Sequence, residues 1–383
     1  MIFAGWMITH WNFSAPLWRI DKMSDYRKET EAKLNLKIEE LLKDVPQFVS
    51  SYILSISVNT SASTRLEYLR DIKRFLSYIM ESYTDAKINS ITDITLDIIE
   101  SLDVDFLNSY SLYLKTYMKN GKIRTNSDVA ISRKQSSIRS MYAFLYSNDK
   151  IKSNPMVKVA SPKIKTNSII YMENDETKDF LNAVASGGTN KMQAAYHNKQ
   201  KIRDYALISL LLSTGLRVSE CVGLDIKDID FKHYEIRLIR KGGRKDKIYM
   251  SDSLAAIMDE YVQFRKLQTA LPSHEDALFL SSQKKRMGVR AVEKLVEKYR
   301  EQAALSKHIT PHKLRSTYGT NLYEVTGDLY LVAELLGHKS VETTKSHYAN
   351  ISNKYKFDNR NRLEDSEKFA INKNTNIEDI NEN

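Results

Sequence analysis

Apolar residues recur every three or four positions in two segments of the first half of the chain, 60–83 and 129–146. This spacing places the apolar side chains on one face of a helix. The inward positions are Leu66, Leu69, Ile72, Leu76 and Ile79 in the first segment, and Ile131, Ile138, Met141, Tyr142 and Leu145 in the second. Only 6 Pro and 12 Gly interrupt the 383 residues. We therefore predict a mainly α-helical protein with a small β-hairpin or sheet.

A basic stretch at 152–168 divides the chain. It carries Pro155, Pro162 and four lysines with little apolar periodicity, which is typical of an extended linker. We predict a helical domain over 45–151 and a second domain over 169–358. Residues 1–44 are expected to be an N-terminal extension, with translation starting at Met23. The tail at 359–383 is rich in Asn and acidic residues and is predicted to be disordered.

In the second domain, apolar spacing predicts helices at 202–213, 254–267, 289–305, 311–325, 329–337 and 341–349. The segment from 230 to 250 alternates polar and apolar residues around Gly242-Gly243, which predicts a β-hairpin. Arg240, Lys241, Arg244 and Lys245 flank its turn.

The formal net charge is +10 and the pI is about 9.2, which favours a polyanionic partner such as nucleic acid. Solvated charge is the ordinary alternative for each basic residue alone. The candidate phosphate contacts on the outward helix faces and on the hairpin are Arg65, Arg70, Lys73, Arg133, Lys134, Arg139 and Arg244.

Cys221 is the only cysteine, so an intramolecular disulfide and a clustered-thiolate metal site are excluded. We expect a buried, inert thiol. No stretch reaches the ~18 apolar residues that a membrane span needs. A membrane partner is therefore not expected.

An ordered set of residues in the second half of the chain carries the chemistry. Arg217 lies in Thr-Gly-Leu-Arg-Val-Ser-Glu and Lys241 in Arg-Lys-Gly-Gly-Arg. His312 and Arg315 share Pro-His-Lys-Leu-Arg, His338 lies in Leu-Leu-Gly-His, and Tyr348 follows. Guanidinium groups hold phosphate oxygens through paired N–H donors, and a phenolic oxygen can attack phosphorus. Such an inventory indicates DNA strand exchange without a metal or another cofactor.

Two of these arginines suit a phosphate clamp, Arg217 and Arg315. Glu220 is one helical turn from Arg217, and we interpret it as the carboxylate that orients this arginine. His312 and Arg315 are three positions apart, so both project from one face of a helix that begins at Pro311. His312 and His338 could instead bind a metal, but they are far apart in sequence without a zinc motif.

The ordered set resembles that of the tyrosine recombinase (phage integrase) family, and the resemblance covers the chain from about Val45 to about Phe357. Within the family the chain is most similar to Xer-type (XerS-like) recombinases, through Ile-Arg-Lys-Gly-Gly-Arg-Lys-Asp and Thr-Pro-His-Lys-Leu-Arg. The resemblance implies a two-domain DNA clamp, in which a helical core-binding (SAM-like) domain precedes the catalytic domain. It also implies that Tyr348 is the nucleophile, His312 assists its proton transfer, His338 donates to the phosphate and Lys241 protonates the leaving oxygen.

The implied partners are a double-stranded DNA recombination site, four protomers on two such sites, and a DNA translocase or another accessory protein. The implied location is the nucleoid in the cytoplasm of a prokaryote. The implied role is Xer-like chromosome dimer resolution through a 3′-phosphotyrosyl intermediate.

One feature departs from the common family pattern. Tyr348 falls ten residues after His338 rather than nine, with His347 at the usual position. Some integrases of mobile elements show the longer spacing, so an integrase of a phage or transposon is the first alternative. A catalytically silent DNA-binding regulator is the second. An RNA-binding helical protein would explain the charge but not the ordered motifs.

Overall fold

The computed structural model describes residues 25–84, 87–119, 121–164, 169–186, 191–240 and 243–338. The chain separates into two compact units between Ile164 and Lys165, a position inside the predicted linker. Met23, Lys241, Tyr348, the predicted helix at 341–349 and the tail at 359–383 lie outside the described residues.

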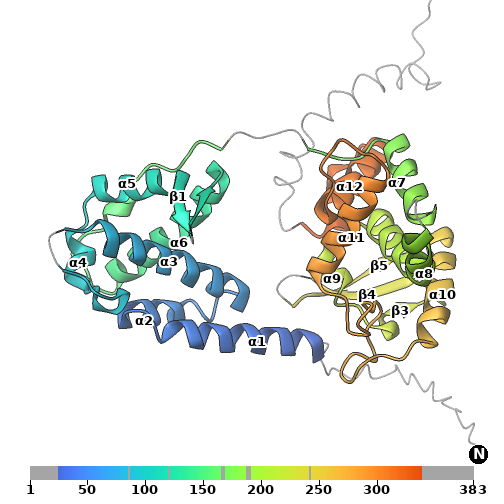
Figure 1. The fold of residues 1–383 in the computed structure, drawn as a ribbon, viewed down its shortest axis with the longest axis horizontal. Helices are drawn as coiled ribbons and strands as arrows, with labels where there is room; N and C mark the ends of the chain where they lie inside the picture. The colour runs from blue at the N-terminus through green and yellow to red at the C-terminus, as the bar shows by residue number, and fades with distance from the viewer. Residues whose placement is uncertain are drawn as a thin grey trace, which may run out of the picture. The chain divides into compact units, whose positions relative to one another are not determined.

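The N-terminal unit is a set of helices with one small hairpin (Figure 1). Its elements are α1 (Asp25–Leu42), α2 (Gln47–Ser55), α3 (Ala62–Ser82), the 3-10 helix η1 (Ile91–Asp93), α4 (Leu96–Ser101), α5 (Val104–Lys115), β1 (Thr116–Lys119), β2 (Lys122–Thr125), α6 (Asp128–Ser147) and η2 (Pro155–Val157). The two helices predicted from apolar spacing are confirmed as α3 and α6. Hydroxyl caps begin both, because Ser61 accepts from the Thr64 N–H and Ser127 from the Ala130 N–H.

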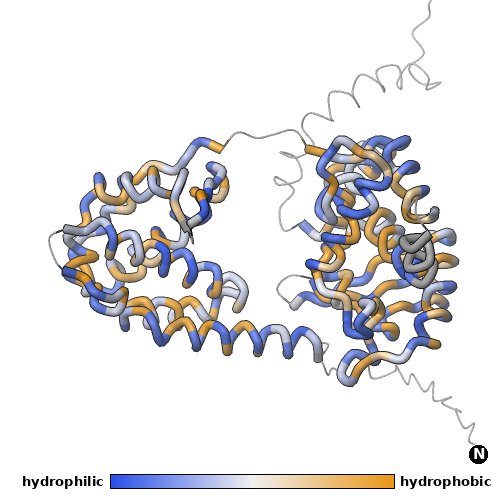
Figure 2. The backbone as a smooth tube through the Cα atoms, viewed as in Figure 1, coloured by the Kyte–Doolittle hydropathy of each residue, from blue (hydrophilic) through white to orange (hydrophobic). Residues whose placement is uncertain are grey.

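The core of this unit forms where α3 and α6 pack together, and all ten predicted inward residues are buried in it. Apolar positions of these helices are orange in Figure 2. Ile38 of α1 belongs to the same core, so the packed unit includes a helix that lies before the predicted boundary at residue 45.

The β1–β2 hairpin is absent from our sequence prediction. Its strands pair antiparallel from Thr116↔Thr125 to Lys119↔Lys122. The sequence does carry a signal, because the Asn120-Gly121 dipeptide is typical of two-residue hairpin turns. Gly121 has a φ of +69°, the left-handed conformation that such turns require.

The C-terminal unit surrounds a three-stranded antiparallel sheet with helices. Its elements are α7 (Asn174–Ser186), α8 (Lys191–Thr214), α9 (Val218–Cys221), η3 (Ile226–Asp228), β3 (Ile229–Asp230), β4 (Glu235–Ile239), β5 (Lys245–Tyr249), α10 (Asp252–Lys266), α11 (Val289–Gln302), α12 (Pro311–Thr326) and α13 (Leu329–Leu336). The predicted hairpin is confirmed as β4–β5, and β3 adds a short third strand. Helix α8 begins earlier than predicted. The prediction missed its first half because the sequence there shows no apolar periodicity.

The apolar second half of α8 is the centre of this unit's core, where Leu207, Ile208 and Leu210 are fully buried. Cys221 is buried, as predicted, and burial together with the charge of Glu220 raises the pKa of its thiol to about 12. The fold class is confirmed as mainly α-helical with small antiparallel sheets. Across the residues with described positions, no helix is both long enough and apolar enough to cross a membrane.

Candidate active site

The chain turns sharply where α8 ends, and this turn places Arg217. Gly215 has a φ of +61°, and a Cβ there would lie 2.4 Å from Cδ1 of Tyr318. Glycine is therefore required both for the left-handed backbone and for the close approach of α12. Arg217 then becomes the N-terminal cap residue of α9.

A buried carboxylate fixes Arg217. Oε1 of Glu220 accepts from Nη1 of Arg217 at 3.0 Å, and Oε2 accepts from the Arg217 backbone N–H at 2.9 Å. Glu220 is 4% exposed, whereas the Arg217 side chain keeps 32% of its surface. Glu220 thus holds both the backbone N–H and one guanidinium nitrogen of the arginine, and the exposed part of the side chain remains accessible to a ligand.

Helix α12 carries the predicted His312 and Arg315. It begins at Pro311, as predicted, and His312 is exposed in its first turn. Arg315 is 4% exposed and donates from Nη1 to the Gly215 carbonyl at 2.7 Å and from Nη2 to the Leu336 carbonyl. The two residues project from one face, with the histidine nearer to the helix N-terminus.

Helix α13 ends in a Schellman motif that places His338. Gly337 has a φ of +61°, its N–H donates to the Glu334 carbonyl at 2.8 Å, and the His338 N–H donates to the Ala333 carbonyl at 2.9 Å. The Leu-Leu-Gly-His sequence thereby stops the helix and turns the chain immediately before the histidine.

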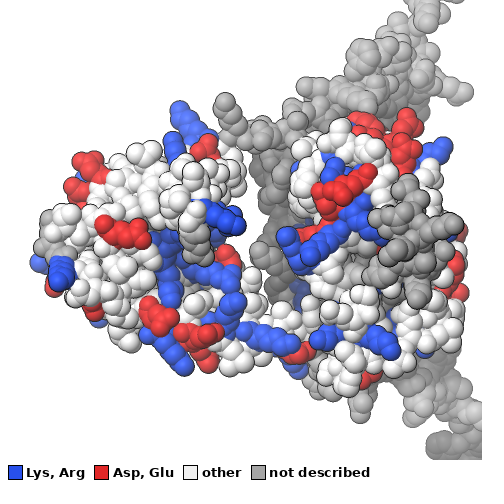
Figure 3. All heavy atoms as spheres, viewed as in Figure 1, with Lys and Arg blue, Asp and Glu red and all other residues white. Residues whose placement is uncertain are grey.

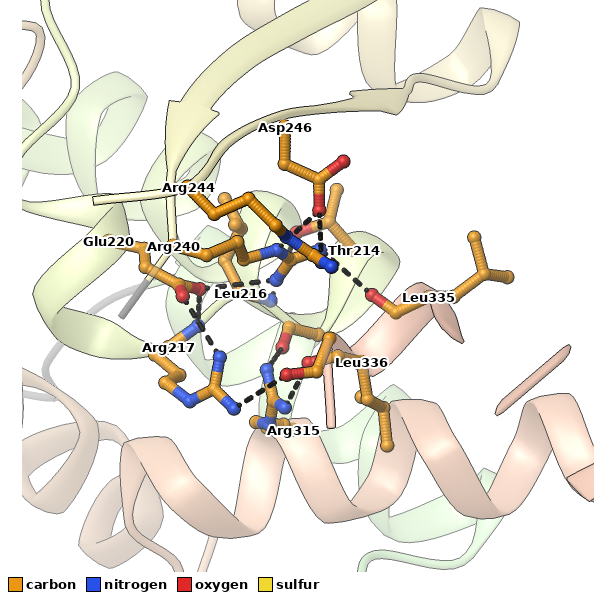
Figure 4. Close-up of polar contacts among 12 residues, drawn as sticks. Thr214, Leu216, Arg217, Glu220, Arg240, Arg244, Asp246, Arg315, Leu335 and Leu336 are labelled. Carbon is orange, nitrogen blue, oxygen red and sulfur yellow. Dashed lines mark hydrogen bonds and ion pairs between the residues drawn. The ribbon is translucent and has the colours of Figure 1, made fainter. Parts of the chain in front are cut away.

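Three arginines from distant segments cap three successive carbonyls at this helix end (Figure 4). Arg240 donates to Leu335 at 3.1 Å, Arg315 to Leu336, and Arg217 to Gly337 at 3.1 Å. Terminal carbonyls of a helix lack partners within the helix and carry partial negative charge, so cations are stabilised there. The arrangement gathers Arg217 and Arg315 next to the residue that precedes His338.

Two carboxylates contact two of these guanidinium groups: Glu220 pairs with Arg217 and Arg240, and Asp246 pairs with Arg240. Burial by itself would raise the pKa of Asp246, but the hydrogen bond and charge of Arg240, with the Lys247 backbone N–H and Arg244, hold that pKa below its ordinary value. Asp246 is therefore ionised at neutral pH. With Arg244, which also pairs with Asp246, four arginines face two carboxylates, and this net positive charge suits a phosphate.

Arg240 is the residue of this cluster that sequence reasoning did not single out. It is 4% exposed. A signal was present, because β4 buries Ile236 and Leu238 and strand alternation places position 240 on the same face. A charged residue on the buried face of a strand needs partners.

A pocket of about 400 Å³ lies in the N-terminal unit, and basic residues dominate its lining. Figure 3 shows Lys and Arg side chains gathered on this unit around α3. The lining residues are Glu67, Arg70, Asp71, Lys73, Arg74, Ser77, Tyr117, Arg133 and Lys134. The fold thus brings four of the predicted phosphate contacts to one surface.

The carboxylate of Asp71 organises this pocket. It is 4% exposed and lies between α3 and α6, where Arg133 donates to both of its oxygens at 2.8 and 3.1 Å. Lys134 is 3.6 Å from Asp71, and its side chain is only 14% exposed. Our prediction that Lys134 points outward is therefore wrong. The buried carboxylate attracts the ammonium group inward.

The other predicted phosphate contacts also have protein partners. Arg65 donates to Asn35 at 2.8 Å, and Lys73 pairs with Asp44 at 3.3 Å. Arg139 is also less outward than predicted, since it is partly buried and donates to the Val159 carbonyl at 3.2 Å. The remaining pairs are exposed: Arg70 with Glu67 at 2.5 Å and Arg244 with Asp246 at 3.4 Å.

No group of three or more His, Cys, Asp or Glu residues that could hold a metal occurs among the described residues. That the reaction needs no metal or other cofactor stays a prediction.

The sequence model of the phage integrase family matches residues 171–354. The tyrosine recombinase XerS of Streptococcus uberis is 34% identical over 334 residues, which cover 80% of this chain and 93% of that protein. The chain belongs to the phage integrase family of tyrosine recombinases. XerS of Streptococcus thermophilus is 33% identical over 357 residues, covering 84% of this chain and 98% of its own length. The protein is thus a site-specific recombinase that breaks and rejoins DNA, and it is Xer-like in sequence.

Solved structures show the same fold. The Tn1549 transposon integrase in complex with transposon right end DNA aligns with a TM-score of 0.60 at 19% identity, over 82% of this chain and 98% of that chain. The XerH recombinase bound to palindromic difH substrate aligns with a TM-score of 0.55 at 19% identity, over 78% of each chain. Both are recombinases with the two-domain fold predicted from the sequence.

Proposed function

We propose that this recombinase cleaves one DNA strand at a time with Tyr348 as the nucleophile. The phenolic oxygen attacks the scissile phosphorus, the 5′ oxygen leaves, and a 3′-phosphotyrosyl link forms. Lys241 gives the leaving oxygen its proton, and His312 assists removal of the tyrosine proton. A hydroxyl of the partner strand reverses the step, so the phosphodiester energy is retained and no nucleotide cofactor is consumed.

The gathering of Arg217 and Arg315 at the end of α13 carries this proposal. Charge develops on two non-bridging oxygens as phosphorus becomes pentacoordinate, and preorganised guanidinium groups stabilise it without rearranging. Arg315 is fixed by two carbonyls, and Arg217 by Glu220 and one carbonyl. His338 follows these carbonyls directly and would donate to the same phosphate.

The basic pocket of the N-terminal unit supports double-stranded DNA as the substrate. Phosphate contacts from Arg70, Lys73 and Arg133 would position the duplex without reading its sequence. The related structures named above are complexes with recombination-site DNA. We extend that partner to this chain, together with assembly of four protomers on two sites.

The biological role we propose is chromosome dimer resolution. It would take place in the nucleoid of a prokaryotic cytoplasm, with a DNA translocase or another accessory protein. The sequence similarity to XerS over 80% of the chain supports it. The ten-residue spacing from His338 to Tyr348 favours the alternative, an integrase of a phage or transposon.

The nucleophile is tested with Tyr348→Phe, which removes one oxygen and keeps the ring. The variant should bind its site but form no covalent complex with a nicked DNA substrate. Tyr355→Phe is the matched control, because Tyr355 is the next tyrosine in the sequence, and it should behave like the wild type. If Tyr348→Phe is still captured covalently, the nucleophile lies elsewhere, and the Tyr355 variant shows whether it is that residue.

The role is tested by sequencing the DNA that becomes covalently linked to the protein in its host. One chromosomal site, unlinked to mobile genes, is the expected result. Sites at the two ends of a mobile element would establish the integrase role instead. DNA binding without any covalent linkage would indicate a silent regulator.

A further inference from the structure

Arg240 joins three parts of the active site through one buried side chain. Each nitrogen of its guanidinium has its own partner: Nε donates to Asp246 at 2.9 Å, Nη1 to Glu220 at 3.3 Å and Nη2 to the Leu335 carbonyl at 3.1 Å (Figure 4). We propose that Arg240 is a positioning residue that sets the phosphate clamp without touching the phosphate. This inference rests on the proposed role of Arg217.

The first connection runs through Glu220 to Arg217. Oε2 of Glu220 accepts both from Arg240 and from the Arg217 backbone, while Oε1 accepts from the Arg217 guanidinium. Loss of Arg240 would remove one of the two cations that hold this carboxylate. The carboxylate could then rotate, and Arg217 would lose its fixed orientation.

The second connection runs to the end of α13. A Cβ on Gly337 would lie 2.9 Å from Cζ and from Nε of Arg240, so the guanidinium packs directly against the glycine backbone. The same group caps Leu335, two positions before Gly337. Arg240 thereby helps to fix the carbonyls that Arg217 and Arg315 also contact, and the chain that leads to His338.

The third connection is the β4–β5 hairpin. The Arg240 N–H donates to the Arg244 carbonyl at 2.7 Å, the Gly243 N–H donates to the Arg240 carbonyl at 3.1 Å, and the side chain crosses to Asp246. The next residue in the sequence is Lys241. The hairpin base is thus tied to the same helix end as the clamp.

Only arginine can make this set of contacts. Its planar fork presents donors in fixed, divergent directions, whereas a lysine ammonium is a single point of charge at the end of a flexible stem. Arg240→Lys should therefore fail nearly as fully as Arg240→Met, although it keeps the charge. Arg237→Met is the matched control, because Arg237 lies on the opposite face of β4 and its side chain is 41% exposed.

The experiment measures covalent cleavage at saturating protein on two DNA substrates, and measures site affinity separately. One substrate has the normal scissile phosphodiester, and the other has a neutral methylphosphonate at that position. On the phosphodiester, Arg240→Met and Arg240→Lys should cleave roughly 10- to 100-fold more slowly than the wild type, by analogy with the loss of residues that orient metal ligands. Affinity should stay close to that of the wild type.

On the methylphosphonate most of this defect should disappear, because a methyl group replaces one of the two non-bridging oxygens and less negative charge develops for the clamp to stabilise. An equal fold loss on both substrates, or wild-type cleavage by both variants, would overturn the proposal. Arg240→Lys keeps a cation at the site and serves if Arg240→Met does not fold.

Arg217→Ala is the reference that separates the two hypotheses. If it loses cleavage selectively on the phosphodiester while the Arg240 variants do not, the clamp stands and the positioning role is wrong. If Arg217→Ala shows no such selectivity, the proposed clamp itself fails.

Discussion

The basic pocket of the N-terminal unit leads to a quantitative prediction about salt. Lys73 and Arg133 line it from α3 and α6. We propose to replace both with glutamine, which removes two positive charges and keeps hydrogen-bonding capacity, so that position 133 can still donate to Asp71. In the Lys73 pair with Asp44 the carboxylate side chain is 73% exposed, so the pair is worth about 0–1 kcal/mol and a phosphate can displace it.

Each lost phosphate contact flattens the slope of log affinity against log salt by about 0.9, so two lost contacts flatten it by about 1.8. Over a fourfold rise in salt, from about 50 to about 200 mM, the wild type should then lose about 12-fold more affinity than the variant. The loss of affinity should be similar on specific and unrelated duplexes, because phosphate contacts carry no sequence information.

The assay is a fluorescence anisotropy titration of labelled duplex DNA at several salt concentrations. The control replaces Lys150 and Lys152 with glutamine. Both follow the far end of α6, about 20 Å along the helix axis from Arg133. The control should keep the wild-type slope. A double variant with an unchanged slope would show that the pocket is solvated structure and that the N-terminal unit grips DNA elsewhere or not at all.

Three other outcomes are expected. Gly337→Ala should cost about 1–2 kcal/mol of backbone strain and also displace Arg240, so cleavage should fall. Gly121→Ala is the control, because it introduces the same backbone strain where the new Cβ meets open space. Wild-type cleavage by both variants would contradict the reasoning. Burial and the charge of Glu220 raise the pKa of the Cys221 thiol to about 12, so the thiol should be alkylated at pH 8 only after unfolding. Rapid labelling of active protein would show that the site is open. Strand cleavage should persist in excess EDTA without ATP, and a strict need for magnesium would revive the metal hypothesis.

The sequence alone determined the elements whose stability is local. The apolar spacing of α3 and α6 identified their buried faces, because a helix that packs on one side must repeat its apolar residues every three or four positions. The alternation around Gly242-Gly243 identified the β4–β5 hairpin. The contact of Glu220 with Arg217 was also predictable, since three positions span one helical turn.

Only the tertiary structure decided which distant residues meet. Arg217, Arg240 and Arg315 come from separate segments and meet where α13 ends, because the carbonyls of its last two residues and of Gly337 accept from them. Lys134 turned inward for a similar reason, because packing of α3 against α6 buried Asp71 and left a carboxylate that needed cations. A periodic pattern specifies which face of an element is buried. The partner on that face is set by the packing of the whole unit.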